Sequence, residues 1–171
     1  MKTKPNELTE ILDKAIDRED KARRFYLQAA DKTKDKDGER MFRWLAGEEL
    51  KHFDKLSQQR EVLARGGQWK KMPTEPPITT SDLPRAPEAD GPVKADSGEI
   101  EALQLGITAE KESVALYARA EALSTSPEAK ELFGRLVQEE GGHLVLLEEE
   151  LEWIKNSRQY FTLHRFALPP R

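Results

Sequence analysis

The sequence predicts an all-α protein: a four-helix bundle made of two repeated helical hairpins that are joined by a long crossover. Four long segments repeat their apolar residues at helical spacing. A proline-rich stretch separates the second segment from the third, and the second half of the chain repeats the first at an offset of 91 residues. These three features together predict one domain over residues 1–171.

Each predicted hairpin consists of two amphipathic helices and a short turn. In the first hairpin the polar residues 34–38 form the turn, and Gly66-Gly67 end the second helix. In the second hairpin Ser126 is placed to cap the last helix, and Pro127 takes its first position. We expect helices at about 6–33, 39–65, 97–124 and 127–156, so that the hairpins cover 6–65 and 98–156.

The segment 66–97 contains six of the ten prolines and cannot stay helical for long. It is either a linker between independent domains or a crossover that lets the two hairpins pack together. The crossover is favoured, because each hairpin alone would leave its apolar stripe in water.

Composition excludes several classes of function. A net charge of -4 gives no electrostatic case for binding nucleic acid or an anionic membrane. No apolar run reaches the roughly 18 residues that span a bilayer. Residues 1–10 lack the apolar stretch of a signal peptide, so a cytoplasmic location is the default expectation. The absence of cysteine removes disulfides, iron–sulfur clusters and thiolate metal sites, including a rubredoxin-type centre.

The C-terminal tail, residues 157–171, carries several aromatic and apolar residues. Such a tail usually docks on its own bundle or on a partner chain. On this ground we expect a homodimer.

The internal repeat aligns polar residues as well as apolar ones. Only three histidines occur in the chain, and two of them, His52 and His143, fall in register. Each follows a glutamate by three residues, so that Glu and His lie on one helical face. The aligned polar and aromatic pairs are Glu19/Glu110, Tyr26/Tyr117, Glu48/Glu139, Glu49/Glu140 and His52/His143.

These residues are expected to face the bundle interior. Leucines that belong to the core share the face of each Glu-x-x-His pair, and Glu19 and Glu110 each follow an isoleucine of the apolar stripe by three residues. Four ionised carboxylates in a core are very unfavourable without counter-charges. Two bound cations supply those charges. One Glu from each of two helices plus Glu-x-x-His from each of the other two is a dinuclear ligand set.

The alternative is that each Glu-x-x-His lies on a solvated helix face, which is the ordinary reading of one such motif alone. The register of two motifs, each with an upstream Glu, favours the metal site. Tyr26 and Tyr117 are either core aromatics or hydroxyl donors to ligand carboxylates, and both readings stay open. Glu48 and Glu139 are rotated away from the ligands, so we expect them at the surface or in an interface.

Four stretches resemble the helices of the rubrerythrin-like branch of the ferritin-like diiron family. The resemblance covers roughly residues 8–155 and rests on 15–26, 45–52, 107–117 and 136–143. It implies a ferritin-like four-helix bundle with two iron ions per chain, manganese and zinc being alternatives. By this resemblance, Glu19 and Glu110 of this chain would be terminal ligands, and Glu49 and Glu140 would be bridging ligands. His52 and His143 would bind one metal each.

Two departures from the family pattern bear on function. The rubredoxin domain that supplies electrons is absent from this sequence, so the resemblance implies an external electron donor. Rubrerythrins also carry a glutamate three residues after the third-helix ligand, and Ser113 stands there in this chain. The ligand set is therefore expected to be symmetric, closer to that of bacterioferritin.

The resemblance implies a non-haem di-iron oxidoreductase that reacts with a small oxidant, peroxide or dioxygen, and that could oxidise ferrous iron. The alternatives are an iron-binding protein without significant turnover and a helical module without metal. Metal-dependent stability distinguishes the last from the first two.

Overall fold

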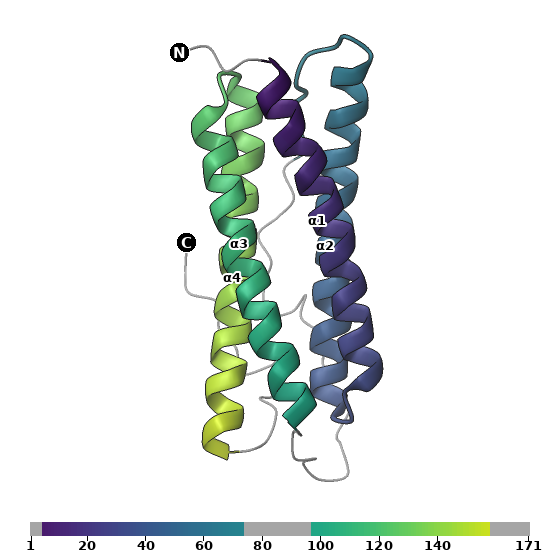
Figure 1. Cartoon of the computed structure of the whole chain (residues 1–171), viewed down its shortest axis with the longest axis vertical. Helices are drawn as coiled ribbons and strands as arrows, with labels where there is room; N and C mark the ends of the chain where they lie inside the picture. Colours follow the sequence, from purple (N-terminus) through teal and green to yellow (C-terminus); the bar gives the residue numbers. More distant parts are fainter. Residues whose placement is uncertain (1–4, 74–96, 158–171) are drawn as a thin grey trace.

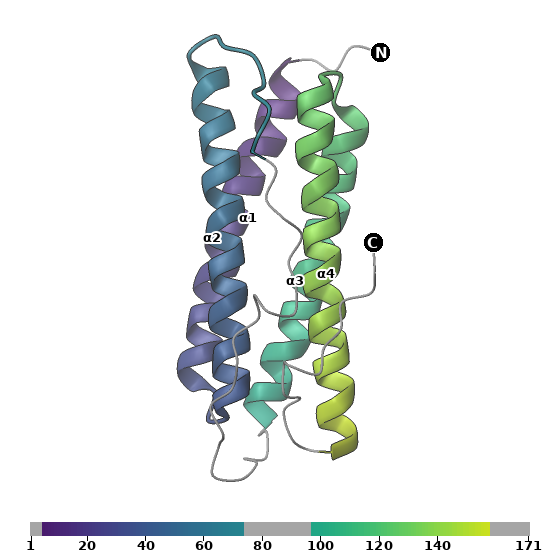
Figure 2. The same cartoon turned by 180° about the vertical axis from the view of Figure 1, so that it is seen from behind.

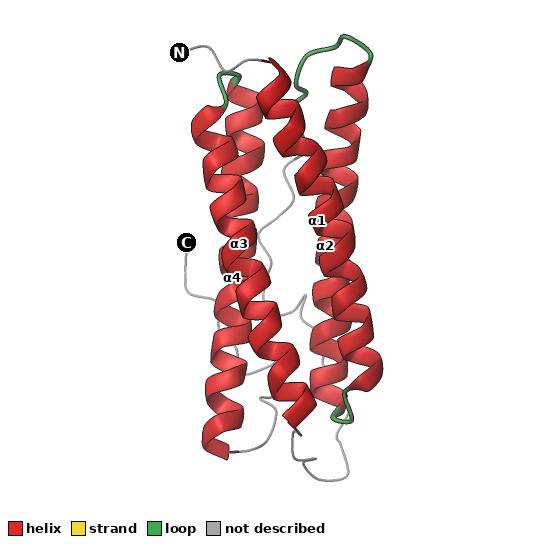
Figure 3. Cartoon of the chain, viewed as in Figure 1, coloured by secondary structure: helices red, strands yellow, loops and turns green. Residues whose placement is uncertain are grey.

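A computed structural model describes residues 5–73 and 97–157 of the chain. Four helices account for nearly all of these residues: α1 Pro5–Lys32, α2 Lys36–Ala64, α3 Ser97–Leu123 and α4 Pro127–Ser157. No strand occurs within these two ranges (Figure 3). The expected crossover residues 74–96 and the tail residues 158–171 lie outside the described residues.

The helices form two antiparallel hairpins, α1 with α2 and α3 with α4, and α1 also lies beside α3. Figure 1 shows α1 and α3 in front, and Figure 2 shows α2 and α4 from the other side. The end of α2 and the start of α3 lie at opposite ends of the bundle (Figure 1). The prediction that the two hairpins pack as one four-helix bundle is confirmed.

The helix ends follow local capping chemistry. Ser126 caps α4 as predicted, since its Oγ accepts a hydrogen bond from the Ala129 amide at 3.3 Å. The start of α2 at about residue 39 was wrong by three residues. Asp35 is the N-cap, and its carboxylate accepts from the amides of Asp37 and Gly38 at 2.8 and 3.1 Å. Because an aspartate at the N-cap satisfies the first amides of the helix, α2 begins within the residues that were expected to form the turn.

Two apolar clusters fill the two ends of the bundle, and the repeat relates them. Each cluster takes residues from all four helices. The fully buried members that correspond across the repeat are Leu12/Leu103, Tyr26/Tyr117, Phe42/Phe133, Leu45/Leu136 and Leu56/Leu147. Along every helix, about three to four turns separate the buried residues of one cluster from those of the other. The stretch between the clusters is where the polar residues of the repeat lie.

The first residues after α2 run back along the bundle. The side chain of Gln59 donates to the carbonyl of Lys70 at 2.7 Å and accepts from its amide at 3.0 Å. Trp69 packs edge-on against Phe133. These contacts fix the beginning of the crossover against both hairpins (Figure 2).

No helix in the described ranges combines the length and the hydropathy of a membrane-spanning segment.

Candidate metal centre

The six side chains predicted as metal ligands meet midway along the bundle. They form two overlapping groups, Glu19, Glu49, His52 and Glu140, and Glu49, Glu110, Glu140 and His143. Within each group one ligand atom per residue lies within 4.8 Å of the others. All six residues are at most 2% exposed. Glu49 and Glu140 belong to both groups, so the arrangement has two centres that share two carboxylates.

Each helix contributes candidate ligands to the cluster, and helical periodicity places them on its inward face. α2 and α4 each present Glu and His on one face because the two residues lie three apart. The two imidazole rings stack with centroids 5.6 Å apart. His52 Nδ1 lies 3.0 Å from Glu140 Oε1 and 3.6 Å from Glu19 Oε2. His143 Nδ1 lies 3.2 Å from Glu49 Oε1 and 3.1 Å from Glu140 Oε2. Both Nδ1 atoms therefore face the carboxylates.

Two tyrosines cross from one hairpin to the other and contact the unshared carboxylates. The Tyr26 hydroxyl on α1 donates to Glu110 on α3, and the Tyr117 hydroxyl on α3 donates to Glu19 on α1. Both tyrosines are fully buried. Burial, followed by the charge of Glu110, raises the pKa of Tyr26 well above its usual range, so this hydroxyl keeps its proton and remains a donor.

Without cations the cluster balances its charge with protons. Burial raises the pKa of Glu19 and of Glu110 well above the ordinary value, which favours the neutral carboxyl. Burial opposes the charge on both imidazoles, yet the surrounding carboxylates raise the pKa of His52 and of His143 well above the usual range. Although burial acts in the opposite direction, His52 and His143 hold the pKa of Glu140 well below its usual value.

The donor set fits cations. In the described part of the chain, six buried side-chain nitrogen or oxygen atoms lack a hydrogen-bond partner, and five belong to this cluster. Those five are Glu19 Oε2, Glu49 Oε1, His52 Nδ1, Glu140 Oε1 and His143 Nε2. Unpartnered buried polar atoms are costly, and carboxylate oxygens beside imidazole nitrogens suit divalent transition metals. A pair of such ions would engage four of these atoms, all except His143 Nε2, which faces away from the carboxylates.

The position three residues after Glu110 does not join the cluster. The Ser113 hydroxyl accepts a hydrogen bond from Arg18 Nε at 2.7 Å, and Arg18 also pairs with Glu112 at 3.0 Å. Ser113 belongs to neither candidate group. The same residue types therefore supply the candidate ligands in both halves. Arg18 was not predicted, because its repeat counterpart is Ala109 and the register offered no signal.

Glu48 and Glu139 were expected at the surface or in an interface rather than among the ligands, and neither belongs to a candidate ligand group, but neither side chain is fully exposed. Glu48 is only 6% exposed and pairs with Lys51 at 2.7 Å. Glu139 is partly buried, and its Oε2 accepts a hydrogen bond from His52 Nε2 at 2.9 Å. Burial alone would raise the pKa of Glu139, but the hydrogen bond from His52, followed by the charge of His52, lowers this pKa to about 2. Glu139 thus supports a candidate ligand, a role that helical spacing alone did not indicate.

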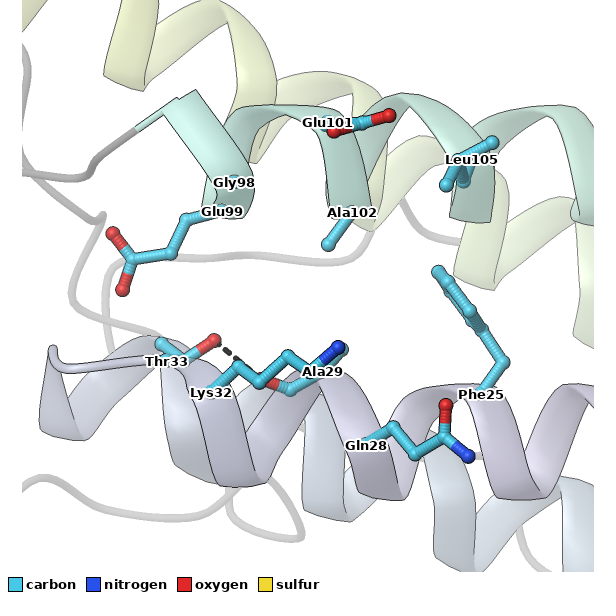
Figure 4. A pocket seen from close by; sticks show the side chains of 10 residues that line it. All are labelled: Phe25, Gln28, Ala29, Lys32, Thr33, Gly98, Glu99, Glu101, Ala102 and Leu105. Carbon is cyan, nitrogen blue, oxygen red and sulfur yellow. Dashed lines mark hydrogen bonds between the residues drawn. The ribbon is translucent and has the colours of Figure 1, made fainter.

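A separate hollow opens between the end of α1 and the start of α3 (Figure 4). At one end of it Phe25 and Leu105 approach each other from opposite sides, and Glu99 lies at the other end (Figure 4). It contains no histidine and none of the six candidate ligands. Metal chemistry therefore belongs to the buried cluster rather than to this hollow.

Comparison with known proteins agrees with this geometry. The rubrerythrin family model matches residues 10–151. A solved structure described as a hypothetical protein from Pyrococcus furiosus superimposes with a TM-score of 0.68 at 29% identity, over 87% of this chain and 90% of that one. No curated protein sequence matches the chain. The family match spans most of the sequence, including all six clustered side chains, and the chain therefore belongs to the rubrerythrin family.

Proposed function

We propose that this protein is a non-haem di-iron oxidoreductase that reduces peroxide or dioxygen. The observation that carries the proposal is the pair of overlapping ligand groups that share Glu49 and Glu140. Two cations held by shared carboxylates can act together on one small oxidant. When bound, the iron would supply the redox chemistry: two ferrous ions give one electron each, and with two protons these electrons reduce one hydrogen peroxide to two waters, or one dioxygen to hydrogen peroxide.

In this proposal the protein side chains have distinct tasks. Glu49 and Glu140, which belong to both groups, would hold both ions; Glu19 and Glu110 would each hold one, and so would His52 and His143. The hydroxyls of Tyr26 and Tyr117 hold the terminal carboxylates in place across the hairpin interface. Near-complete burial of all six ligands keeps bulk water away from them.

The electrons for repeated turnover come, in this proposal, from a separate protein or a small reductant. The sequence contains no cysteine and so has no thiolates for an iron centre of its own. Without such a donor the protein would perform one oxidation per loading and act as an iron-binding protein. We therefore treat turnover and iron binding as separate measurements.

The test is anaerobic loading with ferrous iron, followed by mixing with peroxide or with oxygen-saturated buffer. The readouts are iron per chain and the rise in near-ultraviolet absorbance on oxidation. We expect two irons per chain and oxidation by peroxide. Faster oxidation by oxygen would favour oxidation of ferrous iron as the activity, and uptake without oxidation would favour metal handling. No uptake would contradict every metal-based function.

The adjacent glutamates on α2 provide a matched pair of variants. Glu49→Gln removes a carboxylate common to both groups and should reduce iron uptake. Glu48→Gln removes the neighbouring carboxylate, which pairs with Lys51 instead, and should leave uptake unchanged. Equal effects of the two substitutions would contradict the assigned ligand set.

A further inference from the structure

The repeat symmetry breaks at the outer nitrogens of the two candidate histidine ligands. His52 Nε2 donates to Glu139 Oε2 at 2.9 Å. His143 Nε2 is buried and has no hydrogen-bond partner among the described residues. The ring of His143 instead meets the Trp44 ring edge-on, with centroids 5.6 Å apart and planes at 83°. At its outer nitrogen, the His52 ring therefore contacts a carboxylate, whereas the outer side of the His143 ring has only packing contacts.

The sequence explains why the halves differ. Glu48 and Glu139 occupy the same place in the repeat, but the residue three positions later is Lys51 in one half and Gly142 in the other. Lys51 binds Glu48 at 2.7 Å. Gly142 offers no side chain, so no i+3 lysine draws Glu139 away from His52.

A second difference reinforces the first. Lys55 Nζ lies 3.5 Å from Glu139 Oε2 and balances its charge beside His52. The repeat counterpart of Lys55 is Leu146, which is buried in the core. The arrangement of imidazole, carboxylate and ammonium thus exists on the His52 side, whereas an apolar residue stands in place of the ammonium on the other.

We propose that Glu139 is a positioning residue that fixes the ring and tautomer of His52, so that the metal position completed by His52 binds its ion more tightly than the one completed by His143. The inference rests on the proposed dimetal centre. A hydrogen bond from Nε2 to a carboxylate leaves the Nδ1 lone pair for the metal and makes it more basic. No such bond selects the tautomer of His143.

The test is anaerobic titration with cobalt(II), followed by its visible absorption bands. We expect wild type to bind two ions in two resolved steps. Glu139→Ala should weaken the tighter step by about 10- to 100-fold, the usual effect of removing such a partner of a ligand, and leave the other step unchanged. Glu48→Ala is the matched control and should change neither step.

Single-histidine backgrounds assign the steps to positions. In His143→Ala, which keeps the His52 position, adding Glu139→Ala should cause the same loss of affinity. In His52→Ala, adding Glu139→Ala should have no effect. Glu139→Gln, whose amide oxygen still accepts the Nε2 hydrogen bond, should fall between wild type and Glu139→Ala, a rescue that general damage to the fold would not produce.

Gly142→Lys tests the positioning role of Glu139 without removing any group from the site. A Cβ at Gly142 meets no atom within 4 Å, so this variant should fold. The new lysine should pair with Glu139 as Lys51 pairs with Glu48, and the tighter step should weaken. Far-ultraviolet circular dichroism establishes that each variant remains helical.

These outcomes distinguish failure of the proposed dimetal centre from failure of the proposed role of Glu139. If wild type binds no cobalt, the proposed dimetal centre fails. If wild type binds two ions but Glu139→Ala changes neither step, or weakens both single-histidine proteins equally, the role of Glu139 is overturned and the dimetal centre stands.

Discussion

The hydroxyl of Tyr117 on α3 donates a hydrogen bond to the carboxyl group of Glu19 on α1. Its repeat counterpart, Tyr26 on α1, makes the same contact with Glu110 on α3. Both bonds join one hairpin to the other at the level of the candidate metal centre. The fold and the site therefore depend on the same pairs of residues.

Removing either tyrosine hydroxyl should destabilise the metal-free protein. Tyr117→Phe keeps the ring, which stacks on Phe133, and leaves a buried carboxyl oxygen without its donor. We expect a loss of about 1–3 kcal/mol in the free energy of unfolding, the usual cost of such an unsatisfied group. Urea denaturation with chelator present measures it. Tyr26→Phe should behave alike, and wild-type stability in both variants would contradict this role.

Metal ions should stabilise the folded chain. An ion that binds only the native state adds about 2.7 kcal/mol at a concentration 100 times its dissociation constant. The melting temperature should therefore rise when cobalt(II) or ferrous iron is added and fall when a chelator follows. The double variant His52→Ala, His143→Ala should lose much of this response. A wild-type melting temperature that does not change on addition of metal would support a helical module without metal.

The metal-free protein should become less stable as the pH rises above neutrality. The pKa values of His52 and His143 are raised well above their usual range by the surrounding carboxylates, so the folded state binds protons that the unfolded state has already lost. By linkage, this stabilisation is complete below the ordinary histidine pKa and disappears as the pH passes the raised values. Thermal unfolding with chelator across neutral and alkaline pH measures the slope.

Metal binding should also release protons, because the imidazolium groups and the neutral carboxyls must lose theirs to bind. Calorimetry of metal binding in buffers of different ionisation enthalpy detects them. Binding with no proton release would contradict the charge states inferred for the metal-free cluster.

The two adjacent glycines of α4 should tolerate alanine. A Cβ added at Gly141 or Gly142 meets no atom within 4 Å. Because glycine costs about 0.8–1.0 kcal/mol relative to alanine inside a helix, Gly141→Ala should raise the unfolding free energy by about that amount. Gly106→Ala is the contrasting control, since its Cβ would lie 3.1 Å from Leu147. Destabilisation by Gly141→Ala would indicate that another chain packs there.

The bundle follows from sequence because helical periodicity and the repeat act over whole helices. The same periodicity places Glu19, Glu110 and both Glu-x-x-His pairs on inward faces, and the structure brings these side chains together. The role of Glu139 does not follow from helical periodicity, because this residue contacts a residue of another helix. The position of Glu139 on α4 is rotated away from the candidate ligands of that helix, yet its long side chain reaches His52 on α2.

Other details depended on single local contacts. The carboxylate of Asp35 decides where α2 begins, and no periodic pattern contains that information. Arg18 reaches Ser113 across the two hairpins, a pairing that neither residue signals alone. The contact between Arg18 and Ser113 depends on how α1 and α3 are placed against each other.

The most direct test of the dimetal centre is a crystal structure of the iron-loaded protein with anomalous diffraction data collected at the iron edge. We expect two anomalous peaks per chain, both between Glu49 and Glu140, one beside Glu19 and His52 and the other beside Glu110 and His143. A map without peaks among these six side chains, or with iron bound elsewhere on the chain, would contradict the proposed centre.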